Sequence, residues 1–519
     1  MSRRKAVTLF VVLSTVEFVW CGTIWQSLNL PEEHIPYIFH SNIGLREQCL
    51  NDDQCPYKKA TNITKCFGYE PGCKKEQLML YPECYEPSRS NKAWMNHYNA
   101  SSQEEVFWKQ ADFGFLKERL DEMTMYCEPE HPDDSSLECS TYLRMCKAKN
   151  IYMDFRRHEF TSNNRYVEDI FQKGEIGGHC KLNAEALSKQ SEHKSALQSW
   201  FAELEQYTSL SFRPIKDNKC DVVVDKPTIL MKLDAGVSMY HHFCDFVNLY
   251  LSQHAVSNFS QDINIINWDT SLMRYGDLFS ETWNVFSDYP LQYLKQYDNK
   301  RVCFKTALFP LLARMRYGLY YNTPLISGCK DTALFRAFQQ HVLHRLGVKQ
   351  TGPLKQKVRV TLLSRGTKYR KILNEGEIAE ALSKVNDSVP FKEQLQATLN
   401  SDIFMGIHGS GLTHLLFQPD WGAIFEIYNC DDVHCYEDLA RLRGLKYYTW
   451  DKSEYIKQED EGHHPTLGAH KKFTNYSFDV SEFLRIVKKM ATYVKQHPSF
   501  RAARRLKYKG YDIKNKTEL

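Results

Sequence analysis

Residues 401–414 read SDIFMGIHGSGLTH, and this stretch decides the fold that we expect. An apolar run at 403–407 is followed closely by two glycines, and an amphipathic run begins at Thr413. A buried strand that turns sharply into a helix has this order, because glycine permits a tight turn and the close approach of another group. The stretch therefore predicts one strand–turn–helix unit of an α/β sheet.

The turn is a candidate phosphate site, because N–H groups at the start of a helix and the positive end of its dipole bind anions. It consists of His408, Gly409, Ser410, Gly411, Leu412 and Thr413. It is not a dinucleotide fingerprint, since His414 replaces the third glycine. It is neither a P-loop nor a hydrolase elbow, because it lacks Gly-Lys-Ser/Thr and the outer glycines of Gly-x-Ser-x-Gly. Glycine-rich turns are common, so this motif alone does not decide the function.

Strands and helices alternate on both sides of this stretch from about residue 225. Apolar runs typical of strands lie at 228–233, 263–268, 301–304, 358–364, 402–407, 423–428 and 446–450. Helical patterns lie at 237–254 and 331–346. Strands spaced by helices predict parallel sheets that are covered on both faces. We expect an α/β protein with two Rossmann-like lobes, at 151–325 and 326–490, and a ligand cleft between them.

Basic residues follow the strand predicted at 358–364, at the carboxyl end where open α/β sheets bind ligands. These residues are Arg365, Lys368, Arg370 and Lys371. Guanidinium forks bind a diphosphate through paired hydrogen bonds, whereas the alternative is a solvated basic loop. Glu426 lies near the end of the next strand, where its carboxylate would accept hydrogen bonds from ribose hydroxyls. Together with the glycine turn, these residues predict a nucleoside diphosphate site in the second lobe.

A polar pair lies in the helix predicted at 237–254 of the first lobe. His241 and Asp245 are four residues apart and share a helix face, so they are candidates to supply a general base. Helix capping or core hydrogen bonding is the alternative role. We do not expect zinc to bind His241 and His242 together, because neighbouring residues point to different sides of a helix.

The composition is typical of a folded protein of an oxidising compartment. The chain has 519 residues, of which 42% are hydrophobic, and a formal charge of only +4, without a long basic run for nucleic acid. Its 16 cysteines include no Cys-x2-Cys pair, which favours disulfides over zinc ribbons. We expect a cysteine-rich N-terminal region at 23–150, with supporting helices at 103–125 and 183–207.

Both ends carry targeting signals. Residues 1–22 combine a basic start with a short apolar run and predict a signal peptide. A membrane anchor is the alternative, but Glu17 interrupts a run shorter than the ~20 residues that span a bilayer, and no later segment is apolar enough. The tail at 491–519 ends in a variant of the Lys-Asp-Glu-Leu retrieval signal, with the residues Lys516, Thr517, Glu518 and Leu519.

Sequons for N-glycosylation fit a lumenal protein and stand at Asn62, Asn99, Asn258, Asn386, Asn475 and Asn515, of which we expect the last to lie too near the end of the chain to be used. Together with the two signals, they predict the lumen of the endoplasmic reticulum as the location, with a retrieval receptor as one partner.

Several longer motifs are specific to one family. They are HGSGLTH at 408–414, PDW at 419–421, FEIYNC at 425–430, GHHPTLG at 462–468 and FTNYSFD at 473–479, with further matches at 233–250, 268–270, 315–319 and 323–329. On these motifs the chain resembles the EGF domain-specific O-linked N-acetylglucosamine transferases of inverting glycosyltransferase family 61. The resemblance covers nearly the whole chain beyond the predicted signal peptide.

The resemblance implies transfer of N-acetylglucosamine from UDP-GlcNAc to Ser or Thr hydroxyls of folded EGF-like repeats. The acceptors would be secreted and membrane proteins with such repeats, such as Notch receptors. It implies the two-lobe GT-B architecture and no required cofactor. A divalent metal is not expected, because Arg365 and Arg370 can offset the charge of the leaving diphosphate.

For the site, we expect Asp245 to be the catalytic base, with His241 orienting it or relaying the proton. Arg365 and Arg370 would hold the diphosphate, Glu426 would bind the ribose, and backbone donors would come from Ser410, Gly411 and Leu412.

Two departures from the family pattern stand out. The family motif Asp-Tyr-Asp, associated with optimal activity, corresponds here to Asp288, Tyr289 and Pro290, so one carboxylate is missing. In addition, only residues 384–390 separate two predicted helices where the family has a strand. We therefore expect a missing sheet strand beside the nucleotide site and weaker UDP binding.

Two rival functions remain open from the sequence. One is a related lumenal transferase that extends O-mannose, and the other is a retained, non-catalytic protein that binds EGF repeats. Loss of Cys21 with the signal peptide would leave 15 cysteines, so at least one is unpaired within the chain. We expect Cys244 to be a free buried thiol and Cys430 to bridge to Cys435.

Overall fold

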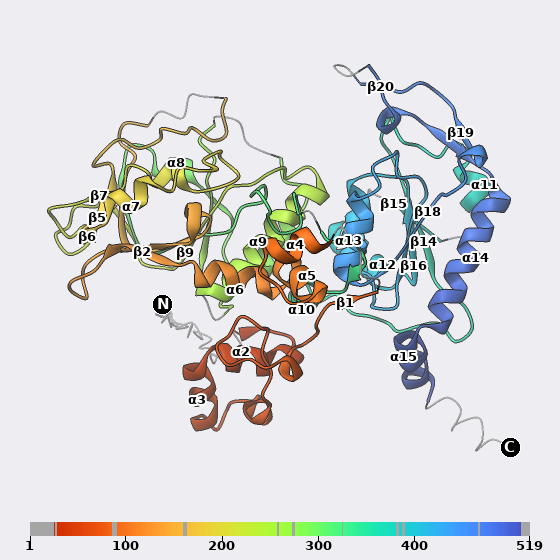
Figure 1. Cartoon of the computed structure of the whole chain (residues 1–519), viewed down its shortest axis with the longest axis horizontal. Coiled ribbons are helices and arrows are strands. Elements are labelled where there is room, and N and C mark those ends of the chain that lie inside the picture. The colour runs from red at the N-terminus through yellow and green to blue at the C-terminus, as the bar shows by residue number, and fades with distance from the viewer. Residues whose placement is uncertain are drawn as a thin grey trace, which may run out of the picture.

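The computed structural model describes residues 25, 28–85, 91–158, 163–256, 259–271, 276–323, 325–379, 383–386, 390–464 and 468–509. Two large β-sheets lie toward opposite ends of the long axis, with helices between them (Figure 1). A small helical module formed by residues 28–85 lies below the first sheet in this view. The predicted signal peptide and retrieval signal lie outside the described residues.

The second sheet is parallel throughout and has the strand order β15-β14-β16-β17-β18. Its strands are β14 (Val360–Ser364), β15 (Ser383–Asn386), β16 (Ile403–Gly406), β17 (Ala423–Glu426) and β18 (Lys446–Thr449). Strand β15 lies on one side of β14, and β16 and the later strands lie on the other side. This reversal of strand order between β14 and β16 is the switch point where such sheets bind ligands. The prediction of a parallel sheet is confirmed for this part of the chain.

Strand β15 corrects the prediction that a sheet strand is missing after Ser383. Residues 383–386 pair in parallel with β14, in a register that places Ser383 opposite Thr361 and Asn386 opposite Ser364. The preceding helix α11 ends at Ala379, which leaves residues 383–386 outside the helix and able to form an edge strand. The edge of the sheet beside β14 is therefore formed.

The first sheet is mixed, so the expectation of parallel strands holds only for part of it. Strands β8 to β12 pair in parallel, whereas β2, β3, β4 and β6 pair antiparallel. The bounds are β2 (Thr124–Glu128), β3 (Ser136–Cys139), β4 (Cys146–Asp154), β5 (Ile176–Gly178), β6 (Lys181–Leu182), β7 (Thr208–Ser209), β8 (Val222–Val224), β9 (Thr228–Met231), β10 (Asn264–Asn267), β11 (Gln292–Tyr293) and β12 (Arg301–Phe309). The boundary expected at residue 150 falls inside β4, so this sheet takes strands from both sides of it.

The remaining described strands form three small two-stranded sheets. They are formed by β1 (Glu83–Cys84) with β13 (Cys329–Lys330), β19 (Ile456–Gln458) with β22 (Tyr476–Phe478), and β20 (His463–His464) with β21 (Gly468–Ala469).

The helices predicted at 237–254 and 331–346 form over nearly the expected residues, whereas the two longer predicted helices do not form as single helices. The described helices are α2 (Ile35–Ser41), α3 (Ile43–Asn51), α4 (Asn91–His97), α5 (Gln103–Ala111), α6 (Phe113–Asp121), α7 (Ala184–Ser188), α8 (Phe201–Leu204), α9 (Met239–Val256), α10 (Ala333–Arg345), α11 (Glu375–Ala379), α12 (Phe391–Leu399), α13 (Cys435–Arg443), α14 (Val480–Gln496) and α15 (Pro498–Tyr508), with the 3-10 helix η7 (Ser410–Phe417). The helix predicted at 103–125 breaks where Asp112 caps α6, and the one predicted at 183–207 is wrong, since only two short turns form there. None of the described helices is both long and apolar enough to cross a bilayer.

The core runs without interruption from the first sheet to one face of the second. In β16, Phe404 packs into this main core, whereas its neighbours Ile403 and Met405 pack on the opposite face. That opposite face is covered by α14, which contributes Phe483 and Ile486. Alternation along a buried strand thus joins the second sheet to the rest of the molecule on one side only.

Six disulfides hold the described chain, and all six precede the second sheet in the sequence. They join Cys49 to Cys55, Cys66 to Cys73, Cys84 to Cys329, Cys127 to Cys180, Cys139 to Cys146 and Cys220 to Cys303. Cys244 is a free buried thiol, as predicted. The predicted bridge between Cys430 and Cys435 is wrong, because both thiols are free.

Candidate active site

Two arginines meet at the carboxyl edge of the second sheet. Arg365 follows β14, and its Nη1 donates to the backbone carbonyl oxygen of His408 at 3.3 Å. Arg370 donates to the same oxygen at 3.0 Å, while its Nε is buried without a hydrogen-bond partner among the described residues. The prediction that these two guanidinium groups lie beside the glycine turn is confirmed.

The turn that follows β16 needs glycine at 409. Gly409 has φ of 154°, and a Cβ there would lie 1.9 Å from Nη1 of Arg365. The helix η7 begins at Ser410, three residues earlier than predicted, and Leu412 donates its N–H to the carbonyl of Gly409. Leu412 is therefore not a donor to a ligand, and the N–H groups of Ser410 and Gly411 are the first of the helix.

His408 and Glu426 form a buried pair. Nδ1 of His408 lies 2.7 Å from Oε1 of Glu426, and Tyr447 donates to Oε2 of the same carboxylate at 2.5 Å. Glu426 is fully buried. Since both carboxylate oxygens are engaged inside the protein, the predicted ribose contact of Glu426 does not fit the structure. Glu426 instead orients the His408 ring under the turn.

Thr413 lies deeper in the same helix. It is fully buried, and its Oγ1 has no hydrogen-bond partner among the described residues. Lys368 is exposed beside the ring of Tyr369, and Lys371 contributes its backbone N–H to the side chain of Asn475. Of the predicted basic residues, the structure therefore brings Arg365 and Arg370 to the turn.

A second polar cluster lies after β9 in the first sheet. Nδ1 of His241, near the start of α9, is 2.9 Å from Oδ2 of Asp234, and Arg314 donates to Oδ1 at 2.9 Å. Burial raises the pKa of Asp234, but the hydrogen bonds from His241 and Arg314 outweigh it and hold this pKa below its usual value. The side chain of His241 is 27% exposed, so its ring can meet a substrate while Asp234 orients it.

Asp245 does not share this accessible position. Its side chain is fully buried, accepts the backbone N–H of Asp234 at 3.0 Å, and lies 3.3 Å from Nδ1 of His242. Burial raises the pKa of Asp245 to about 6, although His242 and the N–H of Asp234 oppose the shift. His242 reaches Asp277 on its other side. Asp245 is therefore enclosed and does not touch a substrate, contrary to its predicted role as the base.

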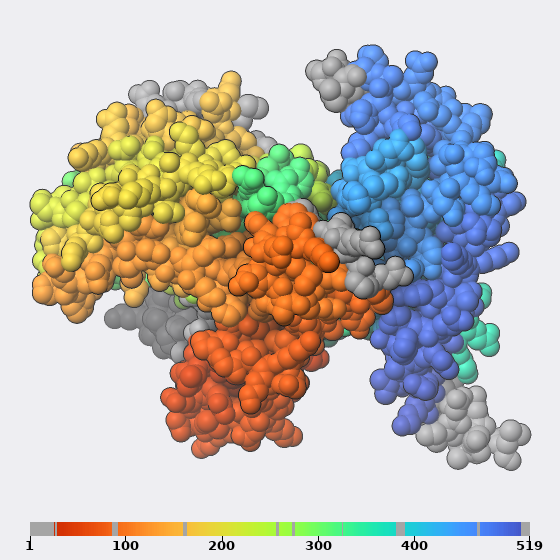
Figure 2. All heavy atoms as spheres, in the orientation of Figure 1, coloured from red at the N-terminus to blue at the C-terminus, as the bar shows by residue number. Residues whose placement is uncertain are grey.

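The two clusters are joined by aromatic rings. Tyr240 precedes His241 and packs against Tyr436 of α13, with ring centroids 5.6 Å apart. Tyr436 in turn lies 5.3 Å from the ring of His408. The carboxyl edges of the two sheets thus face a common region, and the surface is hollowed between the green and blue parts of the chain in Figure 2.

Asp288, Tyr289 and Pro290 lie elsewhere. All three are exposed, and the hydroxyl of Tyr289 binds Asp262 at 2.7 Å and Lys226 at 3.0 Å. Lys226 and Asp262 precede β9 and β10, so they mark the amino edge of these parallel strands. Asp234 follows β9 at the carboxyl edge. The structure therefore places this motif at the sheet edge opposite His241.

The sequons occupy different environments. Asn62 and Asn99 are exposed, whereas Asn475 donates to Asp460 and accepts from Lys371. Asn386 ends the edge strand β15. Asn258 and Asn515 lie outside the described residues.

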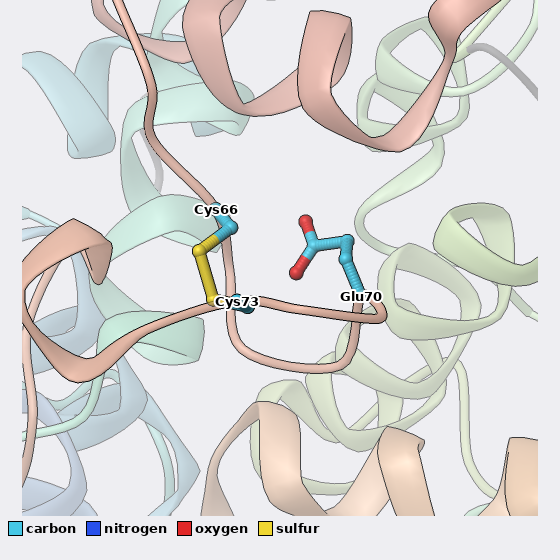
Figure 3. A group of neighbouring side chains, drawn as sticks. All are labelled: Cys66, Glu70 and Cys73. Atoms are coloured by element: carbon cyan, nitrogen blue, oxygen red, sulfur yellow. A yellow bond between two sulfur atoms is a disulfide. The ribbon is translucent and has the colours of Figure 1, made fainter.

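Within the residues that the structure describes, one group of side chains has the spacing of a metal site. Figure 3 shows this group, Cys66, Glu70 and Cys73, in a single loop. The two sulfurs form a disulfide, so neither is available as a thiolate. The carboxylate of Glu70 accepts the N–H groups of Phe67 and Gly68 at 3.0 and 2.8 Å. The group therefore shapes the loop and does not fit a metal ion.

Sequence reasoning missed the side chains that orient the candidate base. Asp234 and Arg314 lie 80 residues apart and belong to different loops, so spacing gives no signal for their pairing. Asp234 could have been predicted as a site residue, because it follows a predicted strand of an open sheet. Tyr447 and Tyr436 read as ordinary core aromatics, and nothing in the pattern distinguishes them.

The chain matches proteins with an assigned activity. The model of the family described as Glycosyltransferase 61 matches residues 239–425, which contain α9, β14, β15, β16 and η7. The EGF domain-specific O-linked N-acetylglucosamine transferase of Pan troglodytes is 55% identical over 488 residues, 92% of each chain. The proteins of the same name are 54% identical over 493 residues in Gallus gallus and 44% identical over 488 in Drosophila melanogaster, with at least 91% of each chain covered. This chain belongs to the family of EGF domain-specific O-linked N-acetylglucosamine transferases.

Proposed function

We propose that the chain transfers N-acetylglucosamine from UDP-GlcNAc to a Ser or Thr hydroxyl of a folded EGF-like module. The single observation that carries this proposal is the pairing of two sites: a cationic turn on one sheet and an oriented imidazole on the other, joined through Tyr240 and Tyr436. A nucleotide-sugar donor needs the first and a hydroxyl acceptor needs the second. The names of the relatives supply the sugar and the acceptor class.

The donor would bind at the second sheet. Arg365 and Arg370 would hold the diphosphate, assisted by the N–H groups of Ser410 and Gly411 at the start of η7. Two fixed guanidinium groups can neutralise the charge that grows on the leaving UDP, which is the part a divalent cation plays in other transferases. This arrangement supports a GT-B type of architecture with two Rossmann-like lobes.

The acceptor would be activated at the first sheet. With Nδ1 of His241 protonated and bound to Asp234, Nε2 can accept the proton of the acceptor hydroxyl. The hydroxyl oxygen then attacks the anomeric carbon, the bond from this carbon to the diphosphate oxygen breaks, and UDP leaves with the electron pair. One displacement inverts the configuration. Asp245 would hold His242 and the backbone of Asp234, and so fix the loop.

The sequence signals at both ends and the six sequons support a location in the lumen of the endoplasmic reticulum, with retrieval by a receptor that reads residues 516–519. Acceptors would be secreted and membrane proteins that carry EGF-like repeats.

The test is an acceptor assay with radiolabelled UDP-GlcNAc. We expect label on a folded EGF module and none on an O-mannosyl peptide, with transfer lost in Arg365→Ala and in His241→Ala. Arg46→Ala, which changes an exposed residue of α3, is the matched control and should retain full transfer. Label on the O-mannosyl peptide alone, or EGF-module binding without transfer by wild type, would reject the proposal.

A further inference from the structure

A cavity of about 450 Å³ lies away from the proposed catalytic groups, between α4, α6 and the loop that follows β12. Tyr98 and His97 form one wall, with ring centroids 4.9 Å apart, and Tyr317 lies 5.6 Å from the ring of His97. This volume is within the roughly 300–1,000 Å³ typical of small-ligand pockets. The cavity is therefore large enough to hold one or two sugar rings.

The charged residues of the cavity suit a neutral, hydroxylated ligand. Arg119 is already bound by Glu122 through two hydrogen bonds, of 3.0 and 2.7 Å. Arg144 is 92% buried, and its Nε has no hydrogen-bond partner among the described residues. A buried donor without a partner is costly, so a ligand oxygen at this position would be stabilising. Three carboxylates, those of Glu118, Asp121 and Glu122, outnumber the two guanidinium groups, so the lining does not favour an anionic ligand.

The chain itself carries an attachment point for such a ligand. Asn99 lines the cavity, is exposed, and begins the sequon Asn99-Ala100-Ser101 at the end of α4. A glycan attached there would be covalently held beside the cavity, so its first sugars would face the aromatic wall at a high effective concentration. Apolar sugar faces can stack on the tyrosine rings, while their hydroxyls can accept from Arg144.

One residue of this aromatic wall, Tyr317, belongs to the loop that also carries Arg314 of the proposed site. Tyr317 has φ of 52°, a left-handed backbone that is strained for a bulky residue. Three residues earlier, Arg314 binds Asp234. A group that packs on Tyr317 would therefore brace the segment that orients the candidate base.

We propose that Asn99 carries an N-linked glycan whose first sugars occupy this cavity and brace the loop at 314–321. The proposal rests on the lumenal location given above, since N-glycans are added there, but not on the transfer reaction.

The experiment uses the full chain expressed through the secretory pathway of a eukaryotic cell. Peptide mass spectrometry measures occupancy at Asn99 and Asn62, and peptide N-glycosidase then removes glycans from native and from denatured protein. We expect release at Asn99 to be at least tenfold slower than at Asn62 in the native protein and equal after denaturation. Tyr317→Ala should remove this difference, whereas Tyr293→Ala, at an exposed tyrosine, should preserve it.

An unmodified Asn99 in a chain that is glycosylated at Asn62 would overturn the inference, and so would equal release from the native protein. These rates are measured on wild type, so they decide the matter even if Tyr317→Ala does not fold. A chain without a glycan at either site would reject the lumenal location and this inference together, while transfer from UDP-GlcNAc is measured separately.

Discussion

The two clusters at the sheet edges differ in how their charges are arranged. At the first sheet, Asp234 is matched by His241 and Arg314, so the charges are paired and the imidazole is held in one orientation. At the second, Arg365 and Arg370 both donate to the backbone carbonyl oxygen of His408. Under the proposed function, the first cluster would move a proton and the second would bind an anion. Separate substitutions should therefore separate turnover from donor binding.

His241→Ala should have the largest effect, because it removes the group proposed to accept the proton. We expect kcat for transfer to an EGF module to fall by about 10²–10⁴. The affinity for UDP, measured by calorimetric titration, should stay within about twofold of wild type. His131→Ala, at an exposed histidine outside both clusters, is the control and should change neither quantity. If His241→Ala lowered the UDP affinity as much as it lowers kcat, the proposal that the two sheets have separate roles would be wrong.

Arg370→Ala changes the second cluster and should weaken UDP binding. Truncating one partner of a charge-assisted contact costs about 2–5 kcal/mol, so the Kd for UDP should rise by about 30-fold or more. Lys368→Ala is the matched control, because this cation lies on the same loop but is exposed, and we expect less than a twofold change. Equal effects of the two substitutions would mean that the loop contributes only diffuse positive charge.

Asp245→Asn tests whether the enclosed carboxylate of the first cluster acts as the base. Since Asp245 is enclosed, we expect kcat and the UDP affinity to remain within about threefold of wild type. A fall of 100-fold or more in kcat would restore Asp245 as the base.

The same variant should show a pH-dependent stability difference. The pKa of Asp245 is about 6 in the folded state, above its ordinary value of 3.8, so its contribution to stability is present at low pH and is lost as pH rises through 6. Between pH 4 and pH 7, the free energy of unfolding should therefore shift in favour of the asparagine variant by up to about 3 kcal/mol. Chemical denaturation at both pH values measures this shift, and no change between them would contradict the buried, titrating carboxyl.

Pro290→Asp should have the smallest effect. It restores the family pattern at a turn that lies at the amino edge of β9 and β10, away from His241. We expect transfer to change by less than about twofold, with Tyr293→Ala as a control for changes on the same exposed surface. A tenfold gain in kcat would show that this edge acts on the site from a distance.

The sequence predicted the second sheet and its arginines well, because both depend on local order. Strands and helices alternate along 358–450, and Arg365 follows its strand directly. The first sheet was harder, since β4 pairs antiparallel with β12, about 150 residues later. Long-range pairing of this kind leaves no period in the sequence.

The same limit explains the corrected site residues. Helical spacing correctly put His241 and Asp245 on one helix, but it cannot tell that the loop before the helix supplies Asp234. The sequence correctly predicted that Glu426 lies at the end of a strand. Only the fold shows that His408 and Tyr447 form hydrogen bonds to both of its carboxylate oxygens.

The disulfide between Cys84 and Cys329 has a consequence for synthesis. Its cysteines are 245 residues apart, whereas those of the two preceding bridges are 6 and 7 apart. At translation rates of about 5–20 residues per second, Cys84 would wait roughly 10–50 s for its partner while neighbouring thiols had already paired. In an oxidising lumen, Cys84 would therefore be exposed to mispairing with other thiols. Slowing disulfide exchange there should delay folding of the whole chain more than folding of the N-terminal module.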